Sequence, residues 1–195
     1  GVRAILTDAD QEAQIAWFAP PGPPGAPARG ISRLFDPHCR YEGEEVAAVA
    51  AESPQQAWDA VRAIRVEYEI LPAVVDMEEA LKPGAPRVQE LGNSLGPPGE
   101  TKRGDVAQGF AEADVVLEET YRTSCEIHTT VELHGSVVRW DGDRLTVWDS
   151  NQGPFPIQAA LATTLNMPLS KVRVISSYMG GGFGTKLILG KYTVI

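Results

Sequence analysis

The chain has 195 residues, of which 43% are hydrophobic, and a formal net charge of −9 at pH 7. This length fits one large or two small globular domains. The acidic balance argues against a nucleic-acid partner and against an anionic membrane surface, because phosphate binding requires a surplus of lysine and arginine. No apolar run approaches the roughly 20 residues of a membrane-spanning helix, and no signal-peptide pattern is visible.

The cysteine content narrows the possible class of protein further. Cys39 and Cys125 are the only two cysteines. Two thiols cannot supply the four thiolates of an iron–sulfur cluster, and they do not make a disulfide framework. We therefore expect two reduced thiols in a cytoplasmic protein.

The first part of the chain predicts a strand–helix–strand unit. A short strand begins at GVRAILT, and residues 20–27 form a proline-rich surface loop. A second apolar strand covers residues 46–50. A helix then starts with Ser53 at the N-cap and Pro54 at its first position, and VEYEI after it alternates as a half-buried strand does. The predicted apolar face of the helix consists of Ala57, Val61 and Ile64.

The second part follows residues 82–104, a stretch rich in proline and glycine that indicates a linker. Asp105 is expected to cap the short helix VAQGFAEA, and DVVLEETYRT predicts a strand. Asp141 and Gly142 predict a hairpin turn between SVVRW and RLTVW. PIQAALATTLN predicts a helix that ends at Asn166, and KVRVISSY predicts a strand that leads into a glycine-rich loop.

This loop, MGGGFGTK at residues 179–186, indicates a backbone that lies very close to a bound group. It is not a P-loop, because Thr185 stands between Gly184 and Lys186. It is not a dinucleotide-binding fingerprint either, which requires glycine in place of Thr185 and a helix directly afterwards. Phe183 is expected to anchor the loop while its neighbours present N–H groups to an anion or an oxo group. A tight bend without a ligand is the alternative.

Three segments together, MGGGFGTK, SNQGPF and IHTTVELHGSVVRWDGDRLTVW, resemble the molybdenum-binding subunit of the xanthine oxidase family. This family includes aldehyde oxidoreductases and carbon monoxide dehydrogenases. YEGEEVAAVAAES and the residues up to VDMEEAL resemble the α/β hammerhead domain that precedes the cofactor domain. The resemblance implies an α+β chain: residues 1–81 form a hammerhead domain that lacks its N-terminal part, residues 82–104 a linker, and residues 105–195 the first portion of a molybdopterin-binding domain.

The resemblance also implies roles for five residues. Gln152 would hydrogen-bond at the molybdenum centre, and Phe183 would contribute its backbone N–H beside an oxo ligand. Gly181, Gly182 and Gly184 would let the loop approach the pterin, which is molybdopterin or its cytosine dinucleotide form. The dithiolene sulfurs of the pterin hold the metal, so the protein supplies neutral donors rather than thiolates. The alternative for Gln152 is a turn residue that satisfies a strand end.

Some residues depart from the family pattern. Purine-oxidising members have a glutamate at the position of Leu187, so this sequence favours other substrates. The segment HTTVELHG replaces the usual HAPMEPHG, and its His128, Glu132 and His134 invite a zinc-site interpretation. The resemblance instead favours a structural role for Glu132.

The resemblance implies hydroxylation of an aldehyde or N-heteroaromatic C–H with water as the oxygen source. Electrons would pass to iron–sulfur clusters and FAD on partner chains. The expected partners are the remainder of the large subunit, the iron–sulfur and flavin subunits, and a small organic substrate. The general-base glutamate of the family has no match here, so no catalytic residue is assigned and we expect a fragment or a split piece of a longer subunit. The alternatives are a non-catalytic homologue that carries the cofactor or assists assembly, and an unrelated domain with an apolar ligand.

Overall fold

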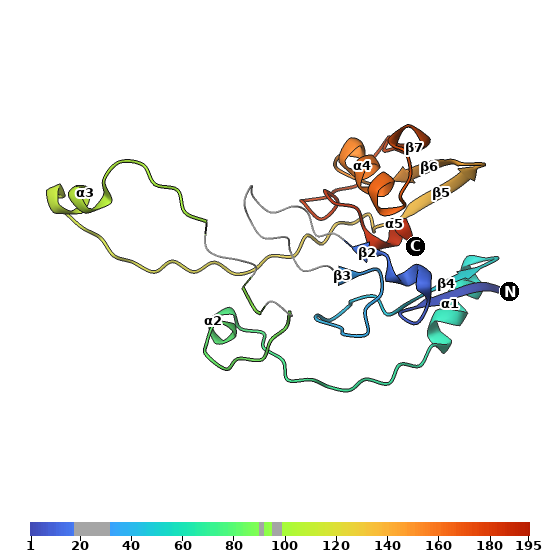
Figure 1. The fold of residues 1–195 in the computed structure, drawn as a ribbon, viewed down its shortest axis with the longest axis horizontal. Helices are drawn as coiled ribbons and strands as arrows, with labels where there is room; N and C mark the ends of the chain where they lie inside the picture. The colour runs from blue at the N-terminus through green and yellow to red at the C-terminus, as the bar shows by residue number, and fades with distance from the viewer. Residues whose placement is uncertain (18–31, 90–91, 95–98) are drawn as a thin grey trace.

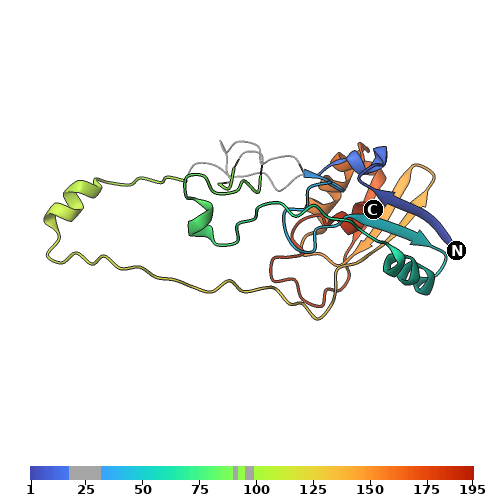
Figure 2. The ribbon, with the colours of Figure 1, turned by 90° about the horizontal axis from the view of Figure 1, so that it is seen from below.

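The computed structural model describes residues 1–17, 32–89, 92–94 and 99–195. Figures 1 and 2 show a compact body that contains both termini and a long extension that leads away from it. We call the described residues between 65 and 127 the open arm. The arm carries two short helices, α2 (Met77–Ala80) and α3 (Val106–Glu112). The predicted proline-rich loop at residues 20–27 lies outside the described residues.

The N-terminal part of the body contains a two-stranded antiparallel sheet and one helix. Strand β1 pairs with β4, and α1 follows β4 directly. The predicted helix start is confirmed, because the Ser53 hydroxyl accepts a hydrogen bond from the Gln56 N–H at 3.3 Å. Of the predicted helix face, Ala57 and Ile64 are half-buried, whereas Val61 is 45% exposed. The bounds are β1 (Val2–Thr7), the 3-10 helix η1 (Gln11–Gln14), β2 (Ala16–Trp17), β3 (Ser32–Arg33), β4 (Ala47–Ala51) and α1 (Pro54–Ala63), with β2 and β3 paired in a second small sheet.

Two predicted strands are absent from the described structure. Residues 66–70 and 114–123 lie in the open arm, where Ile70 is 92% and Val115 is 84% exposed. An alternating sequence can form a strand, but its backbone groups also need a neighbouring strand. None of the described strands pairs with either segment. The prediction of a strand–helix–strand unit was therefore wrong in its last strand.

The C-terminal part of the body contains a three-stranded sheet in the order β5-β6-β7. Strands β5 and β6 form the predicted hairpin, and Gly142 in its turn has a φ of 59°. Strand β7 lies parallel to β6, and α4 connects the two strands. Helix α4 ends just before Asn166, which has a φ of 51°, in agreement with the helix end predicted from the sequence. The bounds are β5 (Ser136–Asp141), β6 (Arg144–Asp149), α4 (Pro154–Thr164), the 3-10 helix η2 (Leu169–Lys171), β7 (Val172–Ile175) and α5 (Lys191–Val194).

Two hydrophobic clusters stabilise the body. The larger one packs α4 against the faces of β6 and β7, and its buried residues include Val147, Ile157 and Leu161. The smaller one is centred on Leu34 and Phe35. Trp17 and Val194 pack against both clusters. Helix α5, which contains Val194, therefore connects the N-terminal and C-terminal parts of the body.

The mixture of short helices with small, mostly antiparallel sheets agrees with the predicted α+β class. Among the helices within the described ranges, none has the length and apolar character needed to cross a bilayer.

Candidate functional site

Two loops meet at one edge of the C-terminal sheet. Residues 150–153 follow β6, and residues 176–186 follow β7. Because β6 and β7 are parallel neighbours, the chain leaves both strands at the same edge, which is where ligands commonly bind in such sheets. The N–H of Gln152 donates to the carbonyl of Lys186 at 2.9 Å and joins the two loops directly.

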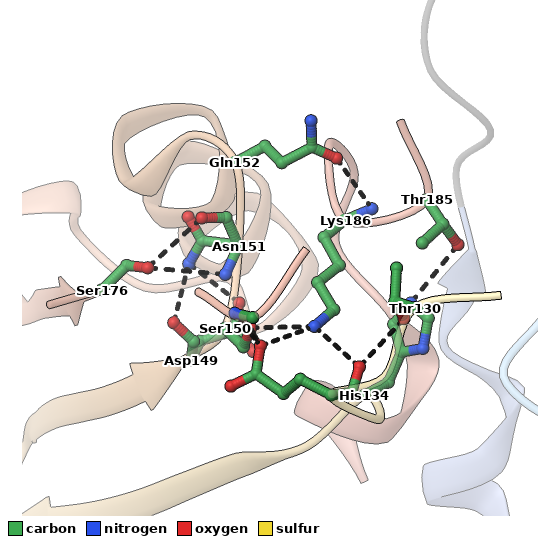
Figure 3. Close-up of polar contacts among 11 residues, drawn as sticks. Thr130, His134, Asp149, Ser150, Asn151, Gln152, Ser176, Thr185 and Lys186 are labelled. Carbon is green, nitrogen blue, oxygen red and sulfur yellow. Dashed lines mark hydrogen bonds and ion pairs between the residues drawn. The ribbon is translucent and has the colours of Figure 1, made fainter. Parts of the chain in front are cut away.

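Alternating side chains orient the first of these loops. Asp149 and Asn151 are buried, and the Asn151 amide donates to an Asp149 carboxylate oxygen at 2.9 Å. The side-chain oxygen of Asn151 also accepts a hydrogen bond from the N–H of Gly153 at 3.0 Å, which fixes the turn before α4. Ser150 and Gln152 alternate with these buried residues and reach the loop that follows β7, as Figure 3 shows.

The amide of Gln152 has a defined direction. Its Oε1 accepts hydrogen bonds from the N–H of Gly184 at 2.9 Å and from the N–H of Lys186 at 3.3 Å. Two N–H donors require the oxygen at this position, so the amide nitrogen must point the other way. Within the described part of the chain, Nε2 of Gln152 has no hydrogen-bond partner. Gln152 therefore presents a neutral N–H donor beside the glycine loop.

The loop glycines are needed for different reasons. A Cβ at Gly182 would lie 2.5 Å from Oε1 of Gln152, and a Cβ at Gly180 would lie 2.7 Å from the Cβ of Glu132. Gly181 and Gly184 instead have φ values of 102° and 97°, which favour glycine. The close approach of the Gln152 amide accounts for glycine at position 182, and the approach of these glycines to a pterin stays a prediction.

A row of free donors lies along the same loop. Across residues 1–17, 32–89, 92–94 and 99–195, the N–H groups of Gly181, Gly182 and Phe183 have no hydrogen-bond partner. Phe183 itself has a φ of 48°, an unusual value for a residue with a side chain. Successive free N–H groups in such a turn form a concave surface that favours oxygen atoms and anions.

The predicted anchoring role of Phe183 was wrong. Its side chain is 74% exposed and therefore does not pack into the hydrophobic clusters of the body. Lys186 holds the loop instead. It is only 1% exposed, and its ammonium group contacts Glu132 Oε2 at 2.8 Å and Ser150 Oγ at 3.0 Å (Figure 3). Sequence reasoning missed Lys186, since a lysine at the end of a glycine loop is normally expected to reach solvent or a ligand.

Glu132 has the structural role predicted for it. Hydrogen bonds from Lys186, Ser150 and the N–H of Gly180 lower the pKa of this carboxyl group from 4.5 to about 2. Glu132 is therefore a carboxylate throughout the neutral range. All three of these hydrogen bonds go to the same oxygen, Oε2, which ties Glu132 to both loops.

The two histidines of the same segment do not form a metal site with Glu132. Nε2 of His134 lies 3.3 Å from the hydroxyl of Thr185, and its ring contacts Tyr192 edge-on at 5.4 Å between ring centroids. His128 lies beside Gly184. No group of three histidine, cysteine, aspartate or glutamate residues in the described ranges could hold a metal ion. The zinc interpretation has no support here.

The fold and the site thus define a protein that exposes neutral hydrogen-bond donors where two parallel strands end. Residues 89–195 match the molybdopterin cofactor-binding domain family. The chain belongs to this family, and the resemblance stated from the sequence is confirmed.

The relatives are molybdenum-binding subunits and dehydrogenases. The chain is 39% identical over 154 residues to a probable xanthine dehydrogenase subunit of Bacillus subtilis (strain 168), covering 78% of this chain and 20% of that protein. It is 32% identical over 196 residues to the aldehyde oxidoreductase molybdenum-binding subunit PaoC of Escherichia coli (strain K12), covering 96% of this chain and 25% of that protein. The chain thus spans about a quarter or less of the length of these relatives.

A solved structure has the same fold. Quinoline 2-oxidoreductase from Pseudomonas putida 86 superposes with a TM-score of 0.77 at 31% sequence identity. The match covers 95% of this chain and 24% of that one. The likeness therefore extends over the open arm as well as the body.

Proposed function

We propose that this chain binds a molybdenum-pterin cofactor through Gln152, Gly181, Gly182, Phe183 and Gly184. The observation that carries the proposal is the set of free donors at one edge of the sheet. The amide nitrogen of Gln152 and three backbone N–H groups of the loop are unpaired within the described chain. The alternative role of Gln152, a turn residue that satisfies a strand end, accounts for its oxygen but leaves its amide nitrogen without a function.

These residues fit the proposed group chemically. All the donors are neutral, so they can bind oxygen atoms without changing protonation state. The absence of a side chain at Gly182 lets the Gln152 amide lie directly against the loop, because a Cβ there would be 2.5 Å from its Oε1. When bound, the cofactor supplies the two-electron oxidation and carries its own sulfur ligands for the metal. The protein orients it: Gln152 and the loop N–H groups donate hydrogen bonds that fix its position relative to β6 and β7.

We further propose that the complete enzyme hydroxylates an aldehyde or an N-heteroaromatic C–H with oxygen from water. The names of the relatives support this class, since they include aldehyde oxidoreductase, nicotinate dehydrogenase and quinoline 2-oxidoreductase. Other relatives are named for xanthine and hypoxanthine. Leu187 is half-exposed at the end of the loop and presents an apolar surface, which favours a substrate without many polar ring atoms.

The domain organisation and the partners are part of this proposal. Residues 1–81 form part of a hammerhead domain, residues 82–104 a linker, and residues 105–195 the first portion of the cofactor domain; the family match beginning at residue 89 supports a boundary in the linker. The remainder of the large subunit, with iron–sulfur and FAD-containing subunits as electron acceptors, completes the enzyme. Both cysteines are free and exposed, in keeping with a cytoplasmic location.

Metal analysis tests the proposal. The purified complete enzyme should contain molybdenum and pterin, and Gln152→Ala in that enzyme should lower turnover by roughly 10–1000-fold through loss of one positioned donor. A panel of aldehydes, nicotinate, quinoline and hypoxanthine in isotope-labelled water identifies the substrate class, because the label must enter the product. Bound cofactor without turnover of any substrate would favour the non-catalytic homologue. Protein free of molybdenum and pterin when produced in a host that makes the cofactor would refute the proposal.

A further inference from the structure

Lys186 is a buried cation whose hydrogen-bonding capacity is fully used. Its side chain is completely inaccessible to solvent, and its ammonium group contacts Glu132 Oε2 at 2.8 Å, Ser150 Oγ at 3.0 Å and the Glu132 carbonyl at 3.1 Å. An ammonium group has three N–H donors, so these three acceptors satisfy it. A buried charge is costly unless it is paired and hydrogen-bonded, and such an arrangement is therefore sharply defined in geometry.

The carboxylate of Glu132 holds the loop at both ends. Its Oε2 accepts a hydrogen bond from the N–H of Gly180 at 2.7 Å, before the free donors, and from the ammonium group of Lys186, after them. Glu132 lies just before β5, whereas Gly180 and Lys186 follow β7. One oxygen atom thus sets the separation between the two ends of the loop and fixes both to a different part of the sheet.

The backbone of Lys186 meanwhile fixes Gln152. The Lys186 carbonyl accepts from the N–H of Gln152 at 2.9 Å, and the Lys186 N–H donates to Oε1 of Gln152 at 3.3 Å. The side chain of Lys186 is therefore held by Glu132 and Ser150, while its main chain holds the amide that presents the free donor. A displacement of the lysine side chain must be transmitted to that amide.

We propose that Glu132 and Lys186 are positioning residues that set the shape of the glycine loop and, through the main chain of Lys186, the direction of the Gln152 amide. The role rests on the proposed function, because it concerns the donors offered to the cofactor. Their role is exerted through protein groups at the two ends of the loop. The pair joins the two ends of the loop like a clamp. The separation of these ends determines the positions of the five residues between Gly180 and Lys186.

Amide hydrogen exchange in the purified full-length protein tests this role. Lys186→Met removes the cation and leaves a carboxylate that is 41% exposed and can be hydrated. We expect the Gly184 N–H, which is bonded to Gln152, to exchange on the order of tenfold faster, as loss of a charged hydrogen-bond partner implies. Adding Glu132→Gln to Lys186→Met should accelerate exchange at Gly184 little further, because the single ion pair that both residues form has already been lost. A purely structural ion pair would loosen Gly180 and leave Gly184 unchanged.

The matched control is Lys171→Met, which removes a partly exposed lysine at the end of η2 that pairs with Asp143 in the β5–β6 turn. It should leave exchange at Gly184 unaltered. If Lys186→Met does not fold, the nearly isosteric Glu132→Gln carries the test. Unchanged exchange at Gly184 in the variant that folds, or failure of both variants to fold, would overturn the positioning role. Because exchange is measured without the cofactor, its outcome is independent of the molybdenum analysis that tests the proposed function.

Discussion

Gly182 and Gly184 are two residues apart in one loop, yet a side chain would disturb the protein differently at each. At Gly182 the new Cβ would meet the end of a flexible side chain, the amide of Gln152. We therefore predict that Gly182→Ala leaves the free energy of unfolding nearly unchanged but displaces the amide and lowers molybdenum content severalfold. Metal analysis beside chemical denaturation checks both parts.

At Gly184 the neighbouring atoms leave room for a methyl group, since His128 would lie 3.8 Å away, but the φ of 97° remains. We predict that Gly184→Ala lowers the free energy of unfolding by about 1–3 kcal/mol through backbone strain. Gly109→Ala is the control, because this helical position in α3 is open and has no positive φ. A Gly184 variant as stable as the Gly109 variant would show that the loop relaxes without cost.

The loss of folding stability at acidic pH should depend on Glu132. Its carboxyl pKa is about 2 in the folded chain and 4.5 when unperturbed. A lowered folded pKa means that the carboxylate stabilises the folded state fully above about pH 4.5, and that this contribution is lost as pH falls toward 2. Glu132→Gln should therefore be less stable than the native protein at neutral pH, and the difference should shrink between pH 4.5 and 2. A stability difference between the two proteins that stays constant from pH 4.5 to 2 would contradict the lowered pKa of Glu132.

At the scale of elements, removal of two similar helix-capping side chains should change the free energy of unfolding by different amounts. Ser53 caps α1, which packs on the β1–β4 sheet, whereas Asp105 caps α3, whose residues are all exposed in the open arm. We predict that Ser53→Ala lowers the free energy of unfolding by about 1 kcal/mol. Asp105→Ala should remove local helicity at α3 without changing global stability. Global denaturation and residue-resolved exchange distinguish the two effects.

Elements whose signals are local were predicted well from the sequence. Ser53 with Pro54, Asp105, Asp141-Gly142 and Asn166 each act within a few residues, and each is found in its expected role. The strands expected at 66–70 and 114–123 failed because pairing depends on a distant neighbour. The site shows the same division. Gln152 and the glycines were assigned to the site by resemblance, and that assignment stays a prediction. The contact of Lys186 with Glu132 spans 54 residues, a separation that no local pattern encodes.

At the scale of the whole molecule, Val194 in α5 should couple the two parts of the body. It packs against both hydrophobic clusters, and Lys191 in the same helix approaches Glu45 at 3.4 Å. We predict that Val194→Ala lowers stability by about 1–2 kcal/mol and broadens the thermal transition, since a shared contact is lost. Val137→Ala, at a 67% exposed position on β5, is the control. Equal, sharp transitions in both variants would refute the coupling.

The open arm should be the first part of the chain to be cleaved by protease. Arg122 lies there in extended backbone with a side chain 71% exposed, and no described strand pairs with its neighbours. We predict that trypsin cuts after Arg122 before it cuts after Arg144 or Arg173 in the sheet. Time-resolved mass spectrometry of the fragments gives the order. Resistance at Arg122 in the complete protein would mean that other parts of it cover the arm.

The reciprocal hydrogen bonds between Gln152 and the loop have a consequence for the pH dependence of any reaction at this site. An amide and backbone N–H groups do not ionise near neutrality, and their supporting carboxylate remains charged down to about pH 2. The donors supplied by Gln152 and by the loop backbone are therefore the same at pH 5 as at pH 9. A bell-shaped rate profile would have to originate from the substrate or from a titrating group other than these donors, and Gln152→Ala should lower the whole curve without moving its limbs.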